Sequence, residues 1–148
     1  MTEILPLPAV LLHKDFGTSN IIVSEPSCHL VGVVDWAEAA IGPFGTNLHS
    51  LLPLYGKVML QRGIALFDDH ASLQETFWGV FLSEVRGLGE KEVAAIKAAR
   101  ILGLLCSKGF SSRLGNKPEP VPIGDDEAGR YNMLYLDGLL LDPATRFD

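Results

Sequence analysis

The residue types best suited to chemistry lie in one stretch, Leu11 to Trp36. His13, Asp15 and Asn20 form an H-x-D followed by four residues and an Asn, and Asp35 follows the next apolar run. A carboxylate in a loop can accept a proton from a hydroxyl group. Amide and carboxylate oxygens are hard ligands of the kind that Mg²⁺ prefers. Phosphoryl transfer to a hydroxyl needs this combination of a base and metal ligands.

Two short strands are expected to position these groups. Apolar residues at Ile21–Val23 and Leu30–Val34 flank a turn, which predicts a β-hairpin. A turn centred on residues 27–28 would place Asn20 opposite Asp35, with the two Cα atoms about 4.5–5.5 Å apart. Their side-chain oxygens could then share one cation, while the preceding loop carries the base.

The motif, the following strand and the aspartate together resemble the aminoglycoside phosphotransferase and choline kinase family, which has a protein-kinase-like fold. The kinase catalytic loop has the same Asp-to-Asn spacing. The resemblance implies that Asp15 is the catalytic base and that His13 braces the catalytic loop. It implies that Asn20 and Asp35 are the metal ligands, and that through Mg²⁺ they bind the phosphates of ATP. The implied substrate is a small molecule with a hydroxyl group.

The resemblance implies an α+β fold: a kinase-like C-lobe whose β-hairpin carries the catalytic loop and packs on a mainly helical body. The nucleotide-binding N-lobe is expected to be absent, because only twelve residues precede His13 and none is Lys or Gly. That lobe supplies a glycine-rich cover and a phosphate-binding Lys. We therefore expect a truncated phosphotransferase domain that is inactive alone. Its apolar surface near Ala9–Leu12 and the hairpin would favour self-association or a partner.

Two alternatives belong to other functional classes. The chain could be a non-catalytic remnant or interaction module that retains the C-lobe fold. A metal phosphoesterase is disfavoured, because the sequence lacks the clustered His and Asp ligands of such enzymes.

Composition excludes several other classes. The 148 residues predict one domain, 1–148, with 47% apolar and 20% charged residues. The net charge of −6 argues against a nucleic-acid partner. No apolar run is long enough for a membrane span or a secretory signal. Cys28 and Cys106 lack metal-ligand spacing. These features predict a cytoplasmic protein.

The chain divides into a catalytic loop and hairpin at 9–36, a helical body at 46–109 and an irregular tail at 110–148. Within the body, helices are expected at His70–Arg86 and Glu90–Lys108. They are expected to pack antiparallel, through contacts that involve Phe77, Phe81, Leu102 and Leu105. Asn47 stands where the family has an aspartate, and is equally well explained as a helix cap.

Two other segments are less regular. Pro53–Leu66 is expected to hold only a short helix or a strand-like piece around Val58–Leu60. In the tail, Asp137–Gly138 predicts a tight turn between apolar runs. The acidic Asp125–Glu127 could face a cationic substrate or lie in a solvated loop. The tail also resembles a phosphotransferase-like subgroup common in fungi.

Overall fold

A computed structural model describes residues 7–111 and 119–147 of the chain. It contains helices and small sheets together, which agrees with the expected α+β class. The described strands pair as three separate two-stranded antiparallel sheets, β1–β4, β2–β3 and β5–β6. The strands are β1 (Ala9–Leu12), β2 (Ile21–Val23), β3 (Leu30–Val33), β4 (Ala40–Pro43), β5 (Gly56–Met59) and β6 (Gly63–Leu66). The helices are α1 (His70–Glu84), α2 (Glu90–Lys108) and α3 (Glu127–Leu136), with 3₁₀ turns η1 (Thr18–Asn20) and η2 (Leu48–Leu54) and a π-helical turn η3 (Asp137–Leu141).

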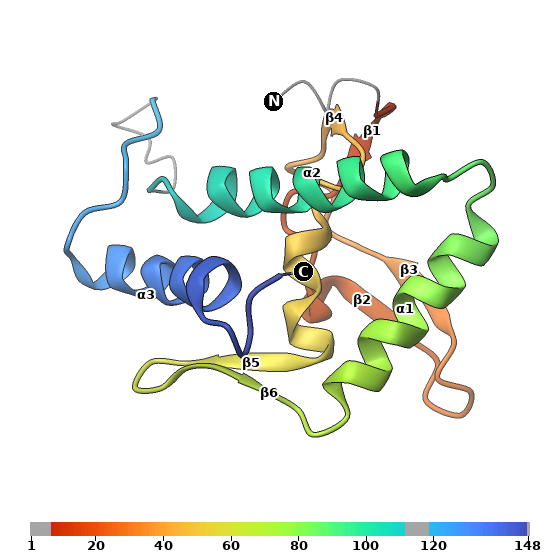
Figure 1. The fold of residues 1–148 in the computed structure, drawn as a ribbon, viewed down its shortest axis with the longest axis horizontal. Helices are drawn as coiled ribbons and strands as arrows, with labels where there is room; N and C mark the ends of the chain where they lie inside the picture. The colour runs from red at the N-terminus through yellow and green to blue at the C-terminus, as the bar shows by residue number, and fades with distance from the viewer. Residues whose placement is uncertain (1–6, 112–118, 148) are drawn as a thin grey trace.

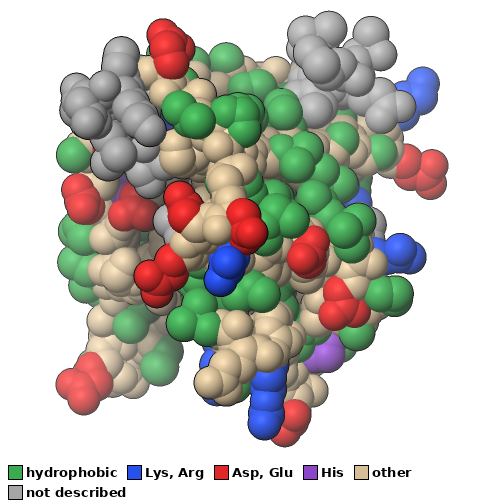
Figure 2. Space-filling view, turned by 90° about the vertical axis from the view of Figure 1, so that its left-hand side faces the viewer, with side chains coloured by type: hydrophobic (Ala, Val, Ile, Leu, Met, Phe, Trp, Pro, Cys, Tyr) green, Lys and Arg blue, Asp and Glu red, His purple; other side chains and the backbone are tan. Residues whose placement is uncertain are grey.

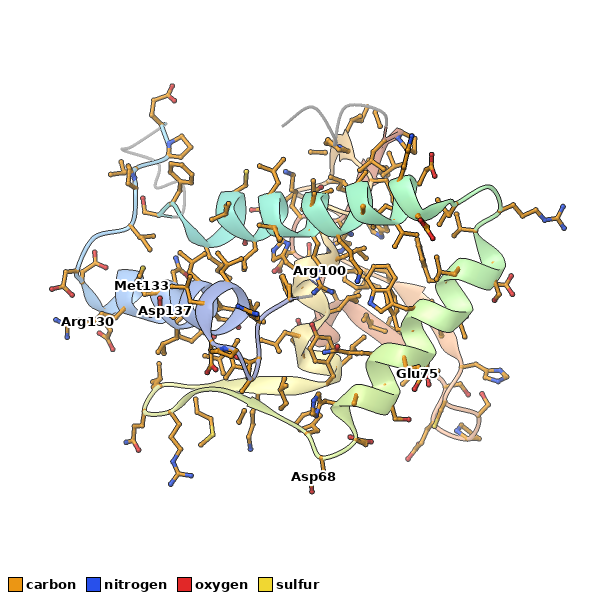
Figure 3. The ribbon with its side chains drawn as sticks, in the orientation of Figure 1. Asp68, Glu75, Arg100, Arg130, Met133 and Asp137 are labelled. Carbon is orange, nitrogen blue, oxygen red and sulfur yellow. The ribbon has the colours of Figure 1, made fainter. Side chains whose placement is uncertain are left out.

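The buried core forms where η2, α2 and η3 meet. Leu52, Tyr55, Leu104 and Leu139 are buried there and form one apolar cluster. Figure 1 shows α2 spanning the molecule, with η2 running down from it and α3 lying along its C-terminal half. Arg100 extends from α2 into this interior (Figure 3), and its guanidinium carbon lies 3.5 Å from the centre of the Phe147 ring. The core therefore joins the C-terminal segment to the middle of the chain.

The strongest helix prediction is confirmed, because α2 has the expected bounds. Glu90 and Glu92 lie in its first turn and Lys108 lies in its last, where charges of these signs complement the helix dipole. The Glu92 carboxylate also accepts a hydrogen bond of 2.8 Å from the Gly89 N–H, which satisfies one of the free donors at the helix start. The α1 helix ends at Glu84, two residues before the expected end.

The expected antiparallel packing of α1 on α2 is wrong. The two helices diverge from the turn that joins them (Figure 1), and α1 has no buried residue. Phe81 stacks on Phe44, with ring centres 5.8 Å apart, and Leu105 is 42% exposed. A cavity of about 360 Å³ lies between α1, η2 and α2. The apolar residues of α1 surround its axis instead of forming one stripe, so the helix has no single face to bury.

The expectation of an irregular tail is also wrong for much of residues 110–148. α3 continues directly into η3, so Asp137–Gly138 is helical and does not form the expected tight turn. A Cβ at Gly138 would lie 2.6 Å from Cδ1 of Ile64. Glycine therefore stands there because η3 packs closely on β6. The proline-rich run that begins at Lys117 is expected not to be helical, and its first two residues, 117–118, lie outside the described residues.

Strands form in two segments whose residue types indicate a loop, at 42–43, or only a short helix or strand-like piece, at 53–66. Gly42 and Pro43 belong to β4, which pairs with β1, and residues 56–66 form the β5–β6 hairpin. Glycine and proline normally indicate a loop, but proline is tolerated at the end of an edge strand such as β4. Asn47 precedes η2 as expected of a cap, yet its side chain makes no capping hydrogen bond.

The described helices include none that combines the length and apolar character needed to cross a membrane.

Candidate active site

Asp15 and Asn20, five residues apart in the sequence, are in direct contact. Asn20 ends η1 and is buried. Its side-chain amide nitrogen donates to the Asp15 backbone carbonyl at 2.8 Å and to the Asp15 carboxylate at 3.3 Å. Both partners are acceptors, so the NH₂ end of the amide must face Asp15. The Asn20 Oδ1 atom is therefore the end left for another ligand.

The backbone of a single residue, Val34, fixes both ends of the loop that carries Asp15. The Val34 N–H donates to the Asn20 carbonyl at 3.0 Å. The Val34 carbonyl accepts a hydrogen bond of 2.7 Å from Nε2 of His13. Val34 immediately precedes Asp35, so the loop that carries Asp15 is tied to the strand end that carries Asp35.

His13 has the position expected of a bracing residue. It is only 3% exposed, and its Nε2 must carry the hydrogen because a carbonyl can only accept. Its Nδ1 is buried without a hydrogen-bond partner among the described residues. The ring lies edge-on to Trp36, with centres 4.8 Å apart, and to Phe16 at 6.0 Å. These contacts fix the imidazole away from solvent, which suits a positioning role better than proton transfer.

Trp36 covers His13 from the outside. The indole N–H donates to the Val33 carbonyl at 2.8 Å, and the side chain remains 44% exposed. A tryptophan directly after an apolar strand is expected to lie in the core and to anchor the end of that strand. Its contacts instead protect the His13 bond to the hairpin.

The hairpin exists as predicted, but its register differs by one residue. Ile21 pairs with Val33, so Asn20 lies opposite Val34 and Asp35 is one residue further on. The turn closes between Ser24 and His29, and the ladder shifts again between Ile22 and Val23. Such a bulge adds a residue on one strand and cannot be read from an apolar pattern.

Asp35 turns away from the ladder at this point. Its φ of 61° places it in the left-handed region, where aspartate is more common than most other residues. It is exposed, and its carboxylate makes no hydrogen bond or ion pair within the described part of the chain. A shared cation between Asp35 and Asn20 stays a prediction.

Asp15 is exposed. A catalytic base needs such exposure, because it must reach the hydroxyl group of a substrate. Lys108, at the end of α2, lies within electrostatic range of it: burial lowers the pKa of Lys108, and the Asp15 carboxylate partly opposes this shift. The Lys108 ammonium also lies 4.5 Å from the centre of the Tyr135 ring. Lys108 is far from Asp15 in the sequence, and no spacing signal pointed to it as a neighbour of the site.

The donor set suits a hard divalent cation that is also held by phosphates. Asn20 Oδ1 and the Asp35 carboxylate are oxygen ligands, and Mg²⁺ commonly takes one or two protein ligands beside phosphates and waters. Within the described ranges, no three His, Cys, Asp or Glu residues are placed to hold a metal by themselves. The site thus fits a metal that arrives with its nucleotide better than a permanently bound metal.

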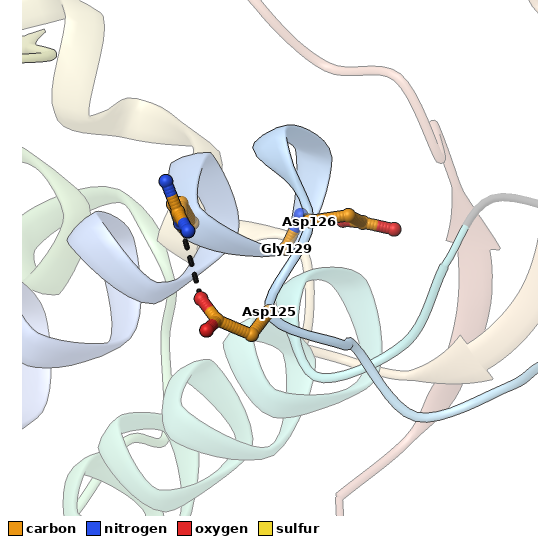
Figure 4. Close-up of polar contacts among 4 residues, drawn as sticks. Asp125, Asp126 and Gly129 are labelled. Atoms are coloured by element: carbon orange, nitrogen blue, oxygen red, sulfur yellow. Dashed lines mark hydrogen bonds and ion pairs between the residues drawn. The ribbon is translucent and has the colours of Figure 1, made fainter.

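Two of the three acidic residues at 125–127 have structural contacts. Asp126 caps α3 by accepting a hydrogen bond of 2.6 Å from the Gly129 N–H, and Asp125 pairs with Arg130 at 3.0 Å (Figure 4). Both members of this ion pair are exposed. In Figure 2 the acidic side chains are spread over the visible face among apolar and basic ones, and do not form one patch. This placement favours the solvated-loop interpretation over recognition of a cationic substrate.

Comparison with known proteins agrees with the chemistry of the loop. The model of the phosphotransferase enzyme family matches residues 1–75, which include His13, Asp15, Asn20 and Asp35. Neither the curated proteins nor the solved structures provide a match. Because the match covers half of the 148 residues, the chain belongs to the phosphotransferase enzyme family.

Proposed function

We propose that the site serves ATP- and Mg²⁺-dependent phosphorylation of a hydroxyl group on a small molecule. Asp15 is the catalytic base, and Asn20 and Asp35 are the metal ligands. His13 is the positioning residue. In this proposal the described residues form the C-lobe of a kinase-like fold, in which the β2–β3 hairpin carries the catalytic loop.

The observation that carries the proposal is the pair of bonds made by the Asn20 amide nitrogen to Asp15. These bonds hold the base and turn the amide oxygen away from it. One side chain thus orients the base and offers a metal ligand. The bonds of the Val34 backbone to Asn20 and His13 support a position of Asp35 beside this unit, because Asp35 is the next residue in the chain.

In the reaction, the substrate hydroxyl donates its proton to the exposed carboxylate of Asp15 as its oxygen bonds to the γ-phosphorus. The bond from that phosphorus to the bridging oxygen breaks, and ADP leaves. Asn20 holds the carboxylate in one orientation, which is a large part of catalysis when positioning dominates. Bound Mg²⁺ would supply neutralisation of the phosphate charge.

The first experiment is a titration of ATP with and without Mg²⁺, followed by fluorescence or calorimetry. We expect binding to require Mg²⁺ and to be lost in Asn20→Ala and Asp35→Asn. Asp68→Asn is the matched control for the loss of one carboxylate, because Asp68 is exposed and lies in the loop before α1, pointing out of the molecule (Figure 3). Equal binding without Mg²⁺, or equal loss in the control, would contradict the metal-site assignment.

The second experiment measures ATP consumption with a panel of amino sugars, choline and small alcohols. The chain alone is expected to show little turnover, and any turnover that is measured should depend on Asp15, so that Asp15→Asn abolishes it while Asp68→Asn retains it. Turnover that survives Asp15→Asn would mean that another residue acts as the catalytic base.

A further inference from the structure

A second cavity adjoins the candidate active site. Its volume is about 350 Å³, and it lies between the β1–β4 pair, the segment before η2 and the C-terminal half of α2. Its lining includes the chain neighbours of two residues at that site: Lys14 precedes Asp15, and Ser107 precedes Lys108, which interacts electrostatically with Asp15. The lining consists of Leu12, Lys14, Ile41, Gly42, Pro43, Thr46, Asn47, His49, Leu102, Gly103, Cys106 and Ser107.

The cavity is electropositive in a chain whose overall charge is −6. Its lining contains one cationic side chain, Lys14, and no Asp or Glu. The pKa of His49 is lowered, first by burial and then by the positive charges of Lys108, Arg100 and Lys14. Three cations therefore act on one wall of this cavity.

The wall around His49 is held in place by its own hydrogen bonds. Nδ1 of His49 lies 2.8 Å from the Thr46 carbonyl, so it must be the protonated nitrogen and Nε2 is left as an acceptor. The Thr46 hydroxyl donates to the Pro43 carbonyl at 2.9 Å. Gly103 of α2 lets this segment approach closely, since a Cβ there would meet the Thr46 carbonyl oxygen. A ligand would thus enter a largely preformed site, as is usual for small-molecule pockets.

We propose that this cavity, the Lys14 pocket, binds the phosphate or carboxylate group of the molecule whose hydroxyl faces Asp15. The proposal rests on the proposed function, because it assigns the substrate class of the same site. Lys14 supplies the charge, and the Asn47 amide and the Ser107 hydroxyl are further hydrogen-bond donors in the same lining.

The substrate class is then a hydroxy acid or a phosphorylated alcohol. An amino sugar or choline would bring a positive charge against Lys14 and would be repelled, even though the resemblance to aminoglycoside and choline kinases suggests such substrates. The nucleotide is the other source of phosphate, and the test must separate the two.

The test titrates inorganic phosphate into the full chain and measures binding by calorimetry or by NMR shifts. We expect saturable binding that Lys14→Gln weakens about tenfold, since a charge-assisted hydrogen bond contributes this much or more. Lys57→Gln is the matched control, because Lys57 is an exposed lysine on β5 and does not line the pocket. Lys14 is exposed, so a thermal melt should show that Lys14→Gln stays folded.

Saturating Mg²⁺-ATP identifies the source of the oxyanion. Phosphate that binds together with Mg²⁺-ATP supports a substrate pocket, whereas displacement by Mg²⁺-ATP assigns the pocket to the nucleotide and overturns the proposal. Absence of saturable binding, or equal binding by Lys14→Gln and the control, also overturns it. Lys14-dependent phosphate binding without Mg²⁺-dependent ATP binding would retain the pocket as an oxyanion site and reject the phosphotransferase function.

Discussion

Gly103 allows a direct test of the packing that forms one wall of the Lys14 pocket. It lies inside α2, where alanine is normally about 1 kcal/mol more favourable than glycine. A Cβ at this position would clash with the Thr46 carbonyl oxygen and would lie 3.0 Å from Nδ1 of His49. The nearer atom belongs to the backbone, so it cannot move as the end of a flexible side chain can.

Gly103→Ala should therefore destabilise the protein. Overpacking a buried site costs about 1–3 kcal/mol, occasionally more, and a backbone clash belongs at the upper end of that range. After the gain in helix propensity is subtracted, we expect a net loss of about 2 kcal/mol in the free energy of unfolding. The assay is urea denaturation with an unchanged m-value, which separates a loss of stability from a change in the denatured state.

Gly79→Ala is the matched control. Gly79 also lies inside a helix, α1, but a Cβ there has no neighbour within 4 Å. Only the propensity term applies, so this variant should be more stable by up to about 1 kcal/mol. Equal or greater stability of Gly103→Ala relative to the parent chain would refute the close approach of α2 to Thr46.

Other changes test separate contacts. Asp126→Ala should lower the free energy of unfolding by about 1 kcal/mol, because it removes the cap of α3. Asp125→Ala should change the free energy of unfolding little, because both partners of its ion pair are exposed. The lowered pKa of His49 means that the fold favours neutral imidazole, so its contribution is complete above the ordinary value of 6.5 and declines as pH falls through the lowered pKa. His49→Asn, whose amide nitrogen can replace Nδ1 in the bond to Thr46, should therefore reduce the loss of stability between about pH 7.5 and about pH 5, measured by denaturant melts; an unchanged pH dependence would contradict this assignment. Trp36→Ala should expose His13 and weaken Mg²⁺-dependent ATP binding, whereas an unchanged affinity would show that the His13 bond to Val34 does not need this cover.

Local sequence signals predicted the elements that depend on local interactions. The α2 helix follows from its apolar stripe, its terminal charges and the glycines that flank it. The β2–β3 hairpin follows from two apolar runs around a turn. The H-x-D-x₄-N spacing located a loop in which Asp15 and Asn20 touch, although the expected partner of Asn20 was Asp35. Spacing thus indicated the site without giving its detailed contacts.

The remaining features depend on contacts between distant parts of the chain. The ladder shift between Ile22 and Val23 leaves no pattern in residue types. Gly42 and Gly138 suggest a loop and a turn, yet each occupies a place where a Cβ would meet a neighbouring side chain. The electrostatic interaction of Lys108 with Asp15 joins residues that lie far apart in the sequence. Such long-range packing overrides local propensity, which is a weak guide by itself.

Apolar side chains remain exposed on the β1–β4 pair and the hairpin, as the sequence predicted. Leu11 and Ile41, which pair across β1 and β4, are 61% and 79% exposed. The hairpin adds Ile22, Val23, Leu30 and Val31. Exposed apolar surface of this kind often marks an interaction site. The self-association or partner binding expected from this surface stays a prediction. Sedimentation at several protein concentrations would test the self-association.

The two hydrogen bonds made by the Val34 backbone determine which neighbouring segments can change in length. Residues 25–28 form the far end of the hairpin and are exposed, so a residue inserted there would leave the bonds from His13 and to Asn20 in place. A residue inserted between Asp15 and Asn20, or between Val33 and Asp35, would break the spacing on which those bonds depend. Related chains should therefore vary freely in the length of this turn while the two spacings stay fixed, and the turn is the safest place to insert a label or tag without disturbing the site.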